Sequence, residues 1–322
     1  MRVLVTGAAG FIGFHVARVL LDRGDTVTGV DNLNDYYDPG LKRDRLQELS
    51  RYPAFSFKRC DIADVDAVSD VFSEAQPERV VHLAAQAGVR YSLVNPHAYG
   101  HSNLTGFLNV LEASRSNKVG HLLYASSSSV YGNTKALPLS ELSAIDSPIS
   151  LYAATKASNE LMAHSYAHLY GMRLTGVRYF TVYGPWGRPD MAPWIFTQRV
   201  LAKEPITVFN YGDMLRDFTY IDDATKATVA LLDREDDERY AIINVGNAKP
   251  EKLNHFIRLL ERILGREAII EYAPLQEGDV KSTHACVERL KELTGFTPPP
   301  ISPMDSRHGR TGSSAITTHH RR

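Results

Sequence analysis

The sequence predicts an α/β protein with a Rossmann-type doubly wound parallel sheet and a smaller mixed α/β C-terminal lobe. From residue 2 to about residue 178, short β-branched runs alternate with stretches of helical period. The first run passes directly into a glycine-rich loop, and two later runs end in small or hydroxyl side chains. Such alternation is typical of a parallel sheet with right-handed helical connections.

Length and composition are those of an ordinary globular protein. The chain has 322 residues, of which 43% are hydrophobic and 23% charged, enough for a large core and two domains. We expect a first domain over 1–178, a second lobe over 179–297 with an interleaved boundary, and a disordered tail over 298–322. A net charge of -1 gives no indication of a nucleic-acid partner.

The cysteine count and the hydropathy pattern suggest a compartment. Cys60 and Cys286 are the only cysteines, too few for a disulfide framework. No apolar stretch approaches the length of a membrane span, and the apolar start runs into glycines instead of forming a signal peptide. We therefore expect a cytoplasmic protein with no membrane partner. The histidines show no metal-ligand spacing, so we expect no metal.

The first unit is a strand, a glycine loop and a helix. The β-branched run at 2–6 predicts a buried strand, and the stretch up to Gly24 predicts a helix. Between them the glycines follow a GxxGxxG spacing instead of GxGxxG. Glycines let backbone N–H groups approach a pyrophosphate at a helix N-terminus. The candidate cofactor-binding residues here are Gly7, Gly10, Phe11, Ile12 and Gly13.

The second strand, at 26–30, ends at Asp31 and Asn32. A carboxylate at this position can accept hydrogen bonds from both adenosine ribose hydroxyls and would repel a 2′-phosphate, which favours NAD over NADP. The alternative is that Asp31 only caps a turn.

Two further strand ends provide candidate contacts with the cofactor. Asp61 and Ile62 follow the next strand, where Asp61 either reaches an adenine or caps a turn. The fourth strand, at 79–83, breaks into small residues, which suit a crevice where a flat cofactor lies against the backbone. A helix over 96–114 follows. The candidates from this part are Leu83, Ala84, Ala85 and Asn103.

The fifth strand, at 120–125, runs into four serines, and a long helix begins near Tyr152 and stops at Gly171. A spacing of four places Tyr152 and Lys156 on one helix face. A phenol loses its proton near pH 10, and an adjacent cation lowers that pKa, so the pair can supply a base at neutral pH. The alternative is an amphipathic helix with a chance Tyr and Lys.

With these residues assembled, the chain resembles extended short-chain dehydrogenase/reductases, specifically nucleotide-sugar epimerases. The resemblance covers about 1–298 and is most specific to the UDP-glucuronate 4-epimerase family. The phrases that carry it are VTGAAGFIGFHVA, DNLNDYYDPGLKRDRL, HLAAQAGVRYSLVNPHAY, RYFTVYGPWGRPDMA and QEGDVKST.

The resemblance implies 4-epimerisation of UDP-glucuronate to UDP-galacturonate with a retained NAD. Tyr152, as phenolate, would take the proton of the sugar 4-hydroxyl while C4 gives up a hydride, and both would return on the other face of a 4-keto sugar. Lys156 would lower the pKa of Tyr152 and hold the nicotinamide ribose. Ser127 matches the catalytic Ser/Thr of the family, and Tyr179 would lie beside the cofactor.

Ser128 and Ser129 separate this chain from related activities. Sugar-nucleotide 4,6-dehydratases carry Asp and Glu at these positions, so we reject dehydration. UDP-glucuronate decarboxylation is harder to exclude, because a 4-keto uronic acid is a β-keto acid. We hypothesise that Arg188, with Thr181 and both serines, holds the sugar carboxylate, since the guanidinium fork binds carboxylates bidentately. The alternative is that Arg188 packs on Trp186.

The resemblance extends to the smaller lobe. It implies that Arg216 contacts the UDP diphosphate, that Asp279 lies near the uridine ribose, and that 208–210 lie beside the uracil. The full set of candidate substrate residues is Gln86, Ser128, Ser129, Thr181, Arg188, Val208, Asn210, Arg216 and Asp279.

Several alternatives and departures remain. A neutral UDP-hexose 4-epimerase is the second reading, and an NAD-binding regulator without chemistry is the third. The family resemblance implies a homodimer through paired helices that include the Tyr152 helix. Relatives usually have Tyr-Ala-Asp at 284–286, where this chain has His-Ala-Cys, and usually end in an amphipathic helix in place of the 298–322 tail.

Overall fold

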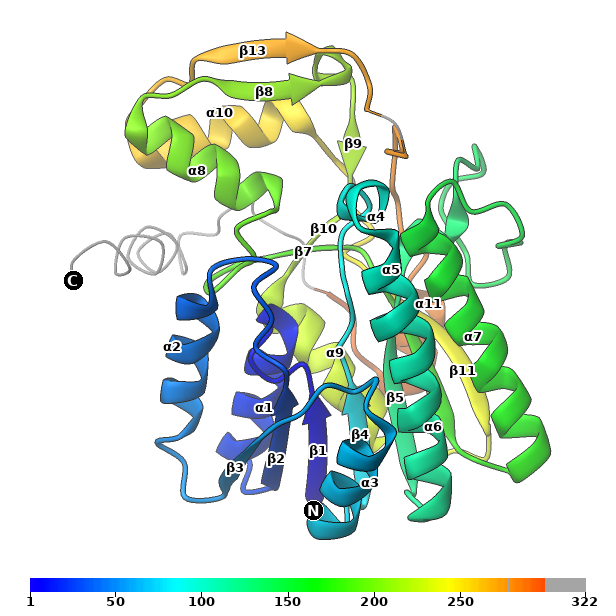
Figure 1. Cartoon of the computed structure of the whole chain (residues 1–322). Helices are drawn as coiled ribbons and strands as arrows, with labels where there is room; N and C mark the ends of the chain where they lie inside the picture. Colours follow the sequence, from blue (N-terminus) through cyan, green and yellow to red (C-terminus); the bar gives the residue numbers. More distant parts are fainter. Residues whose placement is uncertain (277, 299–322) are drawn as a thin grey trace.

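The computed structural model describes residues 1–276 and 278–298. Its centre is a seven-stranded sheet in the order β11-β6-β5-β4-β1-β2-β3, with every neighbouring pair parallel. The predicted doubly wound parallel sheet is therefore confirmed (Figure 1). The strands are β1 (Arg2–Thr6), β2 (Thr26–Asp31), β3 (Phe55–Arg59), β4 (Arg79–His82), β5 (His121–Ser127), β6 (Leu174–Tyr179) and β11 (Tyr240–Val245).

Helices cover both faces of this sheet. Alternate residues of β1 serve opposite faces: Val5 joins the apolar core with α1 and α9, whereas Leu4 joins the core with α3, α6 and α7. Because helices cover both faces of the sheet, the sequences of the central strands are apolar almost without interruption. The helices are α1 (Phe11–Asp22), α2 (Pro39–Leu49), α9 (Ile221–Asp233) and α11 (Glu288–Thr294) on one side, and α3 (Val65–Ala75), α6 (Gly106–Ser116) and α7 (Leu151–Tyr170) on the other.

A smaller lobe lies over the carboxyl edge of the sheet (Figure 1). In it a two-stranded parallel ribbon packs against two helices around its own apolar core. Its elements are α8 (Ala192–Ala202), β8 (Ile206–Phe209), α10 (Leu253–Leu264) and β13 (Ile270–Ala273). Two short ribbons connect the lobe to the sheet domain: β7 (Thr181–Tyr183) with β10 (Phe218–Tyr220), and β9 (Leu215–Arg216) with β12 (Glu251–Lys252).

The chain passes repeatedly between the two parts. The last strand of the large sheet, β11, follows the first half of the lobe, and α10 then returns to the lobe. Leu139 pairs with the backbone around Ala285, which anchors the segment before α11. That helix, α11, begins at Glu288, and the residue before it, Val287, has no side-chain group that could cap it.

The segment expected to be one helix over 96–114 is divided. It contains α5 (Pro96–Tyr99), a π-helical turn over Gly100–Thr105 and then α6. The remaining short helices are α4 (Tyr91–Val94) and two 3-10 turns, Ser128–Tyr131 and Asn210–Gly212. Single π-turns inside helices occur often at functional sites, and this one carries Asn103.

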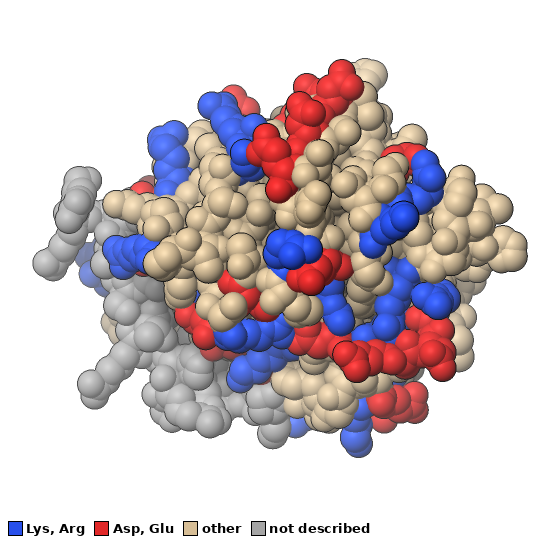
Figure 2. Space-filling view, turned by 90° about the horizontal axis from the view of Figure 1, so that it is seen from below, with Lys and Arg blue, Asp and Glu red and all other residues tan. Residues whose placement is uncertain are grey.

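The surface has no dominant charge on the face seen from below the sheet, where acidic and basic side chains are interspersed (Figure 2). Within the described residues, none of the helices has the length and apolar character needed to cross a membrane. The parallel strands end at one edge, and the loops that leave β1, β2, β4, β5 and β6 converge there beneath the lobe.

Candidate active site

A cavity of about 410 Å³ lies where these loops meet the smaller lobe. Most of the residues predicted from the sequence line it, although they come from strand ends and loops far apart in the chain. These residues are Gly7, Gly10, Phe11, Ile12, Gly13, Asp31, Asn32, Ile62, Leu83, Ala84, Ala85, Gln86, Ser127, Ser128, Ser129, Tyr152, Lys156, Tyr179, Thr181, Arg188, Arg216 and Asp279.

Two predicted cofactor residues do not line the cavity. Asp61 accepts hydrogen bonds from the Ala63 backbone at 2.9 Å and from the Asn32 side chain at 3.2 Å, so it caps a turn and holds its neighbour. Asn103 is buried, and its amide exchanges two hydrogen bonds with the backbone of Gln86, at 2.8 and 3.0 Å. Asn103 therefore holds the loop that lines the cavity instead of facing the cavity itself.

Two predicted uracil residues also lie outside it. The side chain of Val208 is wholly buried in the core of the smaller lobe, which β8 shares with α8 and α10. The Asn210 amide donates to the Asp213 carbonyl at 2.6 Å and closes a tight turn. Neither side chain is presented to a ligand in the cavity.

Some lining residues were missed. Tyr36, Tyr37 and Lys42 come from the loop and helix after β2, and the Lys42 ammonium donates to the backbone and side-chain oxygens of Asn34 at 2.9 and 2.6 Å. The segment DNLNDYYDPGLKRDRL was singled out in the sequence, but no periodicity indicated which of its side chains face inward. The others are Asn34, Cys60, Ala87, Gly88, Val89, Ser102, Ala125, Ser126, Ile149, Ser150, Phe180, Val182, Met191, Gly278, Val280 and Thr283.

The glycine loop has the shape that a dinucleotide pyrophosphate requires. Gly7 has a φ of +72°, and a Cβ there would lie 2.7 Å from the Ala84 nitrogen. A Cβ on Gly13 would lie 2.1 Å from the Gly7 carbonyl oxygen. No side chain caps the N-terminus of α1 after Gly10, so its first N–H groups and the helix dipole can serve an anion. Beside it, Asp31 is buried at the end of β2.

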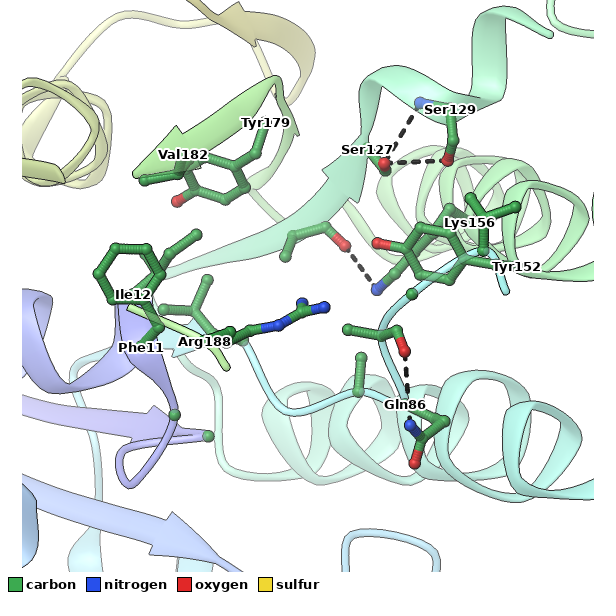
Figure 3. Close-up of a pocket in the computed structure, with 18 of the residues that line it drawn as sticks. Phe11, Ile12, Gln86, Ser127, Ser129, Tyr152, Lys156, Tyr179, Val182 and Arg188 are labelled. Carbon is green, nitrogen blue, oxygen red and sulfur yellow. Dashed lines mark hydrogen bonds between the residues drawn. The ribbon is translucent and has the colours of Figure 1, made fainter. Parts of the chain in front are cut away.

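The Tyr152 side chain stands in the cavity on the first turn of α7. The helix begins there because the Ser150 hydroxyl accepts a hydrogen bond from the Ala153 backbone at 3.1 Å. Ser127 ends β5 opposite Tyr152, and its oxygen accepts hydrogen bonds from the Ser129 backbone at 3.2 Å and hydroxyl at 2.9 Å (Figure 3). A phenol, a hydroxyl and a helix-borne ammonium therefore share one wall.

The electrostatics of this wall differ from the sequence expectation. Burial raises the pKa of Tyr152, and a hydrogen bond with Ser127 and the charge of Arg188 act in the opposite direction. From the sequence, Lys156 was expected to be the cation that lowers the pKa of Tyr152. Its ammonium instead donates to the Ala125 carbonyl at 2.9 Å, and desolvation lowers the pKa of Lys156 to about 8. In this structure the cation that favours the Tyr152 phenolate is Arg188.

Arg188 extends into the cavity towards Tyr152 and Lys156 (Figure 3). Burial acts to lower the pKa of Arg188, but the pairing with Asp190 acts in the opposite direction and the pKa is raised, so the group stays charged at any working pH. Arg216 also lines the cavity, and it donates to Asp279 at 2.9 Å. The two basic groups expected to bind substrate thus line one cavity, and each is paired with an aspartate.

A Rossmann-type sheet with a glycine cradle, a Tyr–Lys–Ser wall and two arginines defines a dinucleotide-dependent enzyme that acts on an anionic substrate. Comparison with known proteins specifies the class. A model of the NAD dependent epimerase/dehydratase family matches residues 3–246.

Relatives cover nearly the whole chain. The probable UDP-glucuronate 4-epimerase of Rhizobium meliloti (strain 1021) is 45% identical over 315 residues, which is 92% of this chain and 92% of that protein. The crystal structure of the UDP-glucuronic acid 4-epimerase from Bacillus cereus, in complex with UDP-glucuronic acid and NAD, has a TM-score of 0.92 at 34% identity, over 98% of this chain and 99% of that one. The UDP-glucose 4-epimerase of Thermotoga maritima, with UDP-glucose, has a TM-score of 0.85 at 33% identity, over 94% and 95%.

The chain belongs to the NAD dependent epimerase/dehydratase family. The predictions of NAD as cofactor and of an NAD-dependent nucleotide-sugar epimerase are therefore confirmed.

Proposed function

We propose that this protein interconverts UDP-glucuronate and UDP-galacturonate by epimerisation at C4. One observation carries the proposal: Arg188, a permanent cation suited to a carboxylate, lies in the same cavity as Tyr152, Ser127 and Lys156. The similarity to the Bacillus cereus enzyme, whose structure holds UDP-glucuronic acid and NAD, supports the same substrate.

The glycine loop and the end of β2 would hold the cofactor. Backbone N–H groups at Gly10 and the start of α1 would bind the pyrophosphate, and Asp31 would accept hydrogen bonds from the adenosine ribose. Asn32, Ile62, Leu83, Ala84, Ala85 and Tyr179 also line the cavity and would complete the contacts with the cofactor. When bound, NAD supplies the acceptor for the C4 hydride and returns it.

Tyr152 would act as the base for the sugar 4-hydroxyl. Its phenolate is favoured by the Ser127 hydrogen bond and by the Arg188 charge, both of which oppose the effect of burial on the Tyr152 pKa. Ser127 would also contact the 4-oxygen, since its hydroxyl lies beside the phenol. Proton transfer by a positioned group of this kind contributes about 10²–10⁴-fold to a rate.

The remaining lining residues would orient the UDP-sugar. Arg188, Thr181, Ser128 and Ser129 all line the cavity and would contact the sugar carboxylate. The other proposed contacts are Arg216 to the diphosphate, Asp279 to the uridine ribose and Gln86 to the sugar.

A second candidate is a 4-epimerase of neutral UDP-hexoses. One observation favours it: Asp190 already balances the charge of Arg188, so the pair carries no net charge. The similarity to the Thermotoga maritima UDP-glucose 4-epimerase points the same way. In this case the loss of Arg188 would leave binding of the neutral sugar nearly unchanged.

Product analysis separates the candidates. Purified protein is incubated with UDP-glucuronate or UDP-glucose, without added NAD, and the sugar nucleotides are separated by chromatography. UDP-galacturonate from the first substrate supports the proposal. UDP-galactose alone would assign the neutral-sugar activity, and UDP-pentose as main product would assign decarboxylation.

We also propose a homodimer paired through α7. Leu161 and Leu169 on this helix are 68% and 66% exposed, and such apolar side chains on one helix suit a helix–helix contact. Light scattering should give twice the monomer mass, and Leu161→Lys should lower it. A cytoplasmic location remains a proposal supported by the two free thiols, Cys60 and Cys286.

A further inference from the structure

Arg188 is held on one side by a carboxylate that does not line the cavity. Its Nε donates to Asp190 Oδ1 at 2.9 Å and its Nη2 donates to Asp190 Oδ2 at 2.5 Å. The phenol of Tyr36, which lies 154 positions earlier in the chain, donates to Asp190 Oδ2 at 3.0 Å. Three side chains from two distant loops therefore form one hydrogen-bonded unit, the Tyr36–Asp190–Arg188 cluster.

A third loop closes over this cluster. Gly88 has a φ of +95°, and a Cβ there would lie 2.8 Å from the Tyr36 hydroxyl and 3.8 Å from Arg188 Nη2. The Tyr99 hydroxyl fixes that loop by donating to the Ala87 carbonyl at 3.0 Å. The ring of Tyr36 also packs against Tyr91, with centroids 4.7 Å apart. The Gly88 loop and the Tyr91 ring thus limit the movement of the cluster.

The pairing leaves a defined edge of the guanidinium for a ligand. A guanidinium has five N–H donors in a planar fork, and Asp190 takes one from Nε and one from Nη2. One N–H on Nη2 and one on Nη1 then point in parallel along the end of the fork, a bidentate site for a carboxylate. Among the described residues no hydrogen bond uses Nη1 of Arg188, and the group reaches into the cavity (Figure 3).

We propose that Asp190, held by Tyr36, is a positioning residue that fixes which edge of Arg188 meets the sugar carboxylate, and that this orientation keeps the carboxylate on the sugar during turnover. The inference rests on the proposed function and adds Asp190 and Tyr36 to the residues that determine its specificity.

The reason lies in the chemistry of a 4-keto uronic acid. Such a β-keto acid loses CO₂ when its C5–C6 bond lies parallel to the π orbital of the C4 carbonyl. The C5–C6 bond then breaks, its electron pair passes towards the C4 oxygen as an enolate, and a proton from solvent adds at C5. Hydride return at C4 gives a UDP-pentose. A carboxylate that is hydrogen-bonded to a fixed edge of the guanidinium keeps the C5–C6 bond out of that alignment. If the guanidinium moves, the carboxylate can rotate and the C5–C6 bond can become aligned with the π orbital.

If Asp190 served only to balance the charge of Arg188, its removal would change KM and product differently. If Asp190 only neutralised Arg188, its removal would expose a full positive charge, and UDP-glucuronate would bind more tightly with no change of product. Loss of positioning instead weakens binding of the acid and releases pentose. The two roles therefore give opposite changes in KM.

The test compares Asp190→Ala, Asp190→Asn and Tyr36→Phe with the wild-type enzyme. A second Tyr–Asp pair supplies matched controls, because Tyr52 donates to Asp22 at 2.6 Å on the surface, outside the cavity. The control variants are Tyr52→Phe and Asp22→Asn. Each protein is assayed for its KM and kcat with UDP-glucuronate and UDP-glucose, for the ratio of UDP-pentose to UDP-galacturonate, and for its melting temperature.

We expect Asp190→Ala to raise the pentose ratio and the KM for UDP-glucuronate by roughly tenfold, the loss expected for a misaligned charged hydrogen bond, with little change in the KM for UDP-glucose. Asp190→Asn retains an acceptor oxygen and should restore part of the selectivity, and Tyr36→Phe should give a smaller shift in the same direction. The controls should match wild type.

An unchanged product ratio in all three variants, or a lower KM for UDP-glucuronate, would overturn the proposal. If Asp190→Ala fails to fold, Tyr36→Phe decides by the same ratio, because it removes a single oxygen. A wild-type enzyme with no turnover of UDP-glucuronate would instead refute the proposed function, and this inference with it.

Discussion

The guanidinium of Arg45 donates a hydrogen bond to the backbone carbonyl of Trp186 at 2.6 Å, across 141 residues of sequence. The same group donates to the Ala9 carbonyl inside the glycine loop at 2.8 Å. Arg45 is wholly buried, so one side chain fastens the cofactor loop to the segment that carries Arg188. The cofactor and substrate ends of the site are thus joined through the interior.

Replacement of Arg45 by Met should disturb both ends together. The change leaves buried carbonyls without donors, at about 1–3 kcal/mol each, so the free energy of unfolding should fall by several kcal/mol. NAD retention and the affinity for UDP-glucuronate should fall in parallel. Urea unfolding and the cofactor content of the purified protein measure both. Arg51→Met serves as the control, because Arg51 is exposed and pairs with Glu48 on the surface. It should change the unfolding free energy by less than about 0.5 kcal/mol.

Tyr152→Phe should remove the base and leave the binding site in place. We expect kcat to fall by about 10²–10⁴-fold and the affinity for UDP-glucuronate to change little, since the ring stays in position. Steady-state kinetics and calorimetric binding measure the two separately. Turnover close to wild type would show that another group takes the proton.

Arg188→Ala should affect acid and neutral substrates differently. Its charge opposes the effect of burial on the Tyr152 pKa, and its fork is proposed to hold the carboxylate, so turnover of UDP-glucuronate should fall and pentose should form. Binding of UDP-glucose should be nearly unaffected. Equal losses of binding affinity for both substrates, with no pentose, would indicate a general structural role.

The stability of the protein should depend on the Lys156 ammonium in the alkaline range. Desolvation lowers the pKa of Lys156 from 10.5 to about 8 in the folded state. Between these values the unfolded chain binds more protons than the folded one, so stability rises with pH. Relative to Lys156→Met, the wild-type unfolding free energy should gain about 2 kcal/mol from pH 8 to pH 9.5. Parallel pH profiles for the two proteins would contradict this account.

A buried ion pair between Glu160 and Arg178 is hydrogen-bonded to the end of β5. Glu160 accepts two hydrogen bonds from Arg178, at 2.9 and 2.7 Å, and one from Ser126 at 2.5 Å. Glu160→Gln leaves the arginine charge buried and unpaired, and should destabilise the fold by about 3–5 kcal/mol. Glu48→Gln removes an exposed ion pair and should cost less than about 1 kcal/mol. Chemical denaturation of both variants tests the contrast.

The sequence predicted those parts of the site that depend on local pattern. The glycine spacing and the first helix predict the cradle, and a spacing of four places Tyr152 and Lys156 on one face of α7. Strand ends in a parallel sheet meet at the edge where ligands bind, so Asp31 and the serines after β5 were expected at that edge, and they line the cavity there.

The remaining features depend on contacts that no local pattern contains. Arg45 and Tyr36 meet partners more than a hundred residues away. Asn103 faces the Gln86 backbone because of a single π-turn, and periodicity does not predict such a turn. The pairing of Arg188 with Asp190 could not be inferred from two charges in one loop, although it changes how the site is charged.

The most direct test of the central claim follows a label at C4. UDP-glucuronate with deuterium at C4 is incubated with the purified protein in ordinary water, without added NAD, and the products are examined by mass spectrometry. Our account predicts UDP-galacturonate that retains the deuterium at C4, because the hydride leaves and returns within one site. UDP-galacturonate that has exchanged the label for solvent hydrogen, or no inverted product at all, would contradict it.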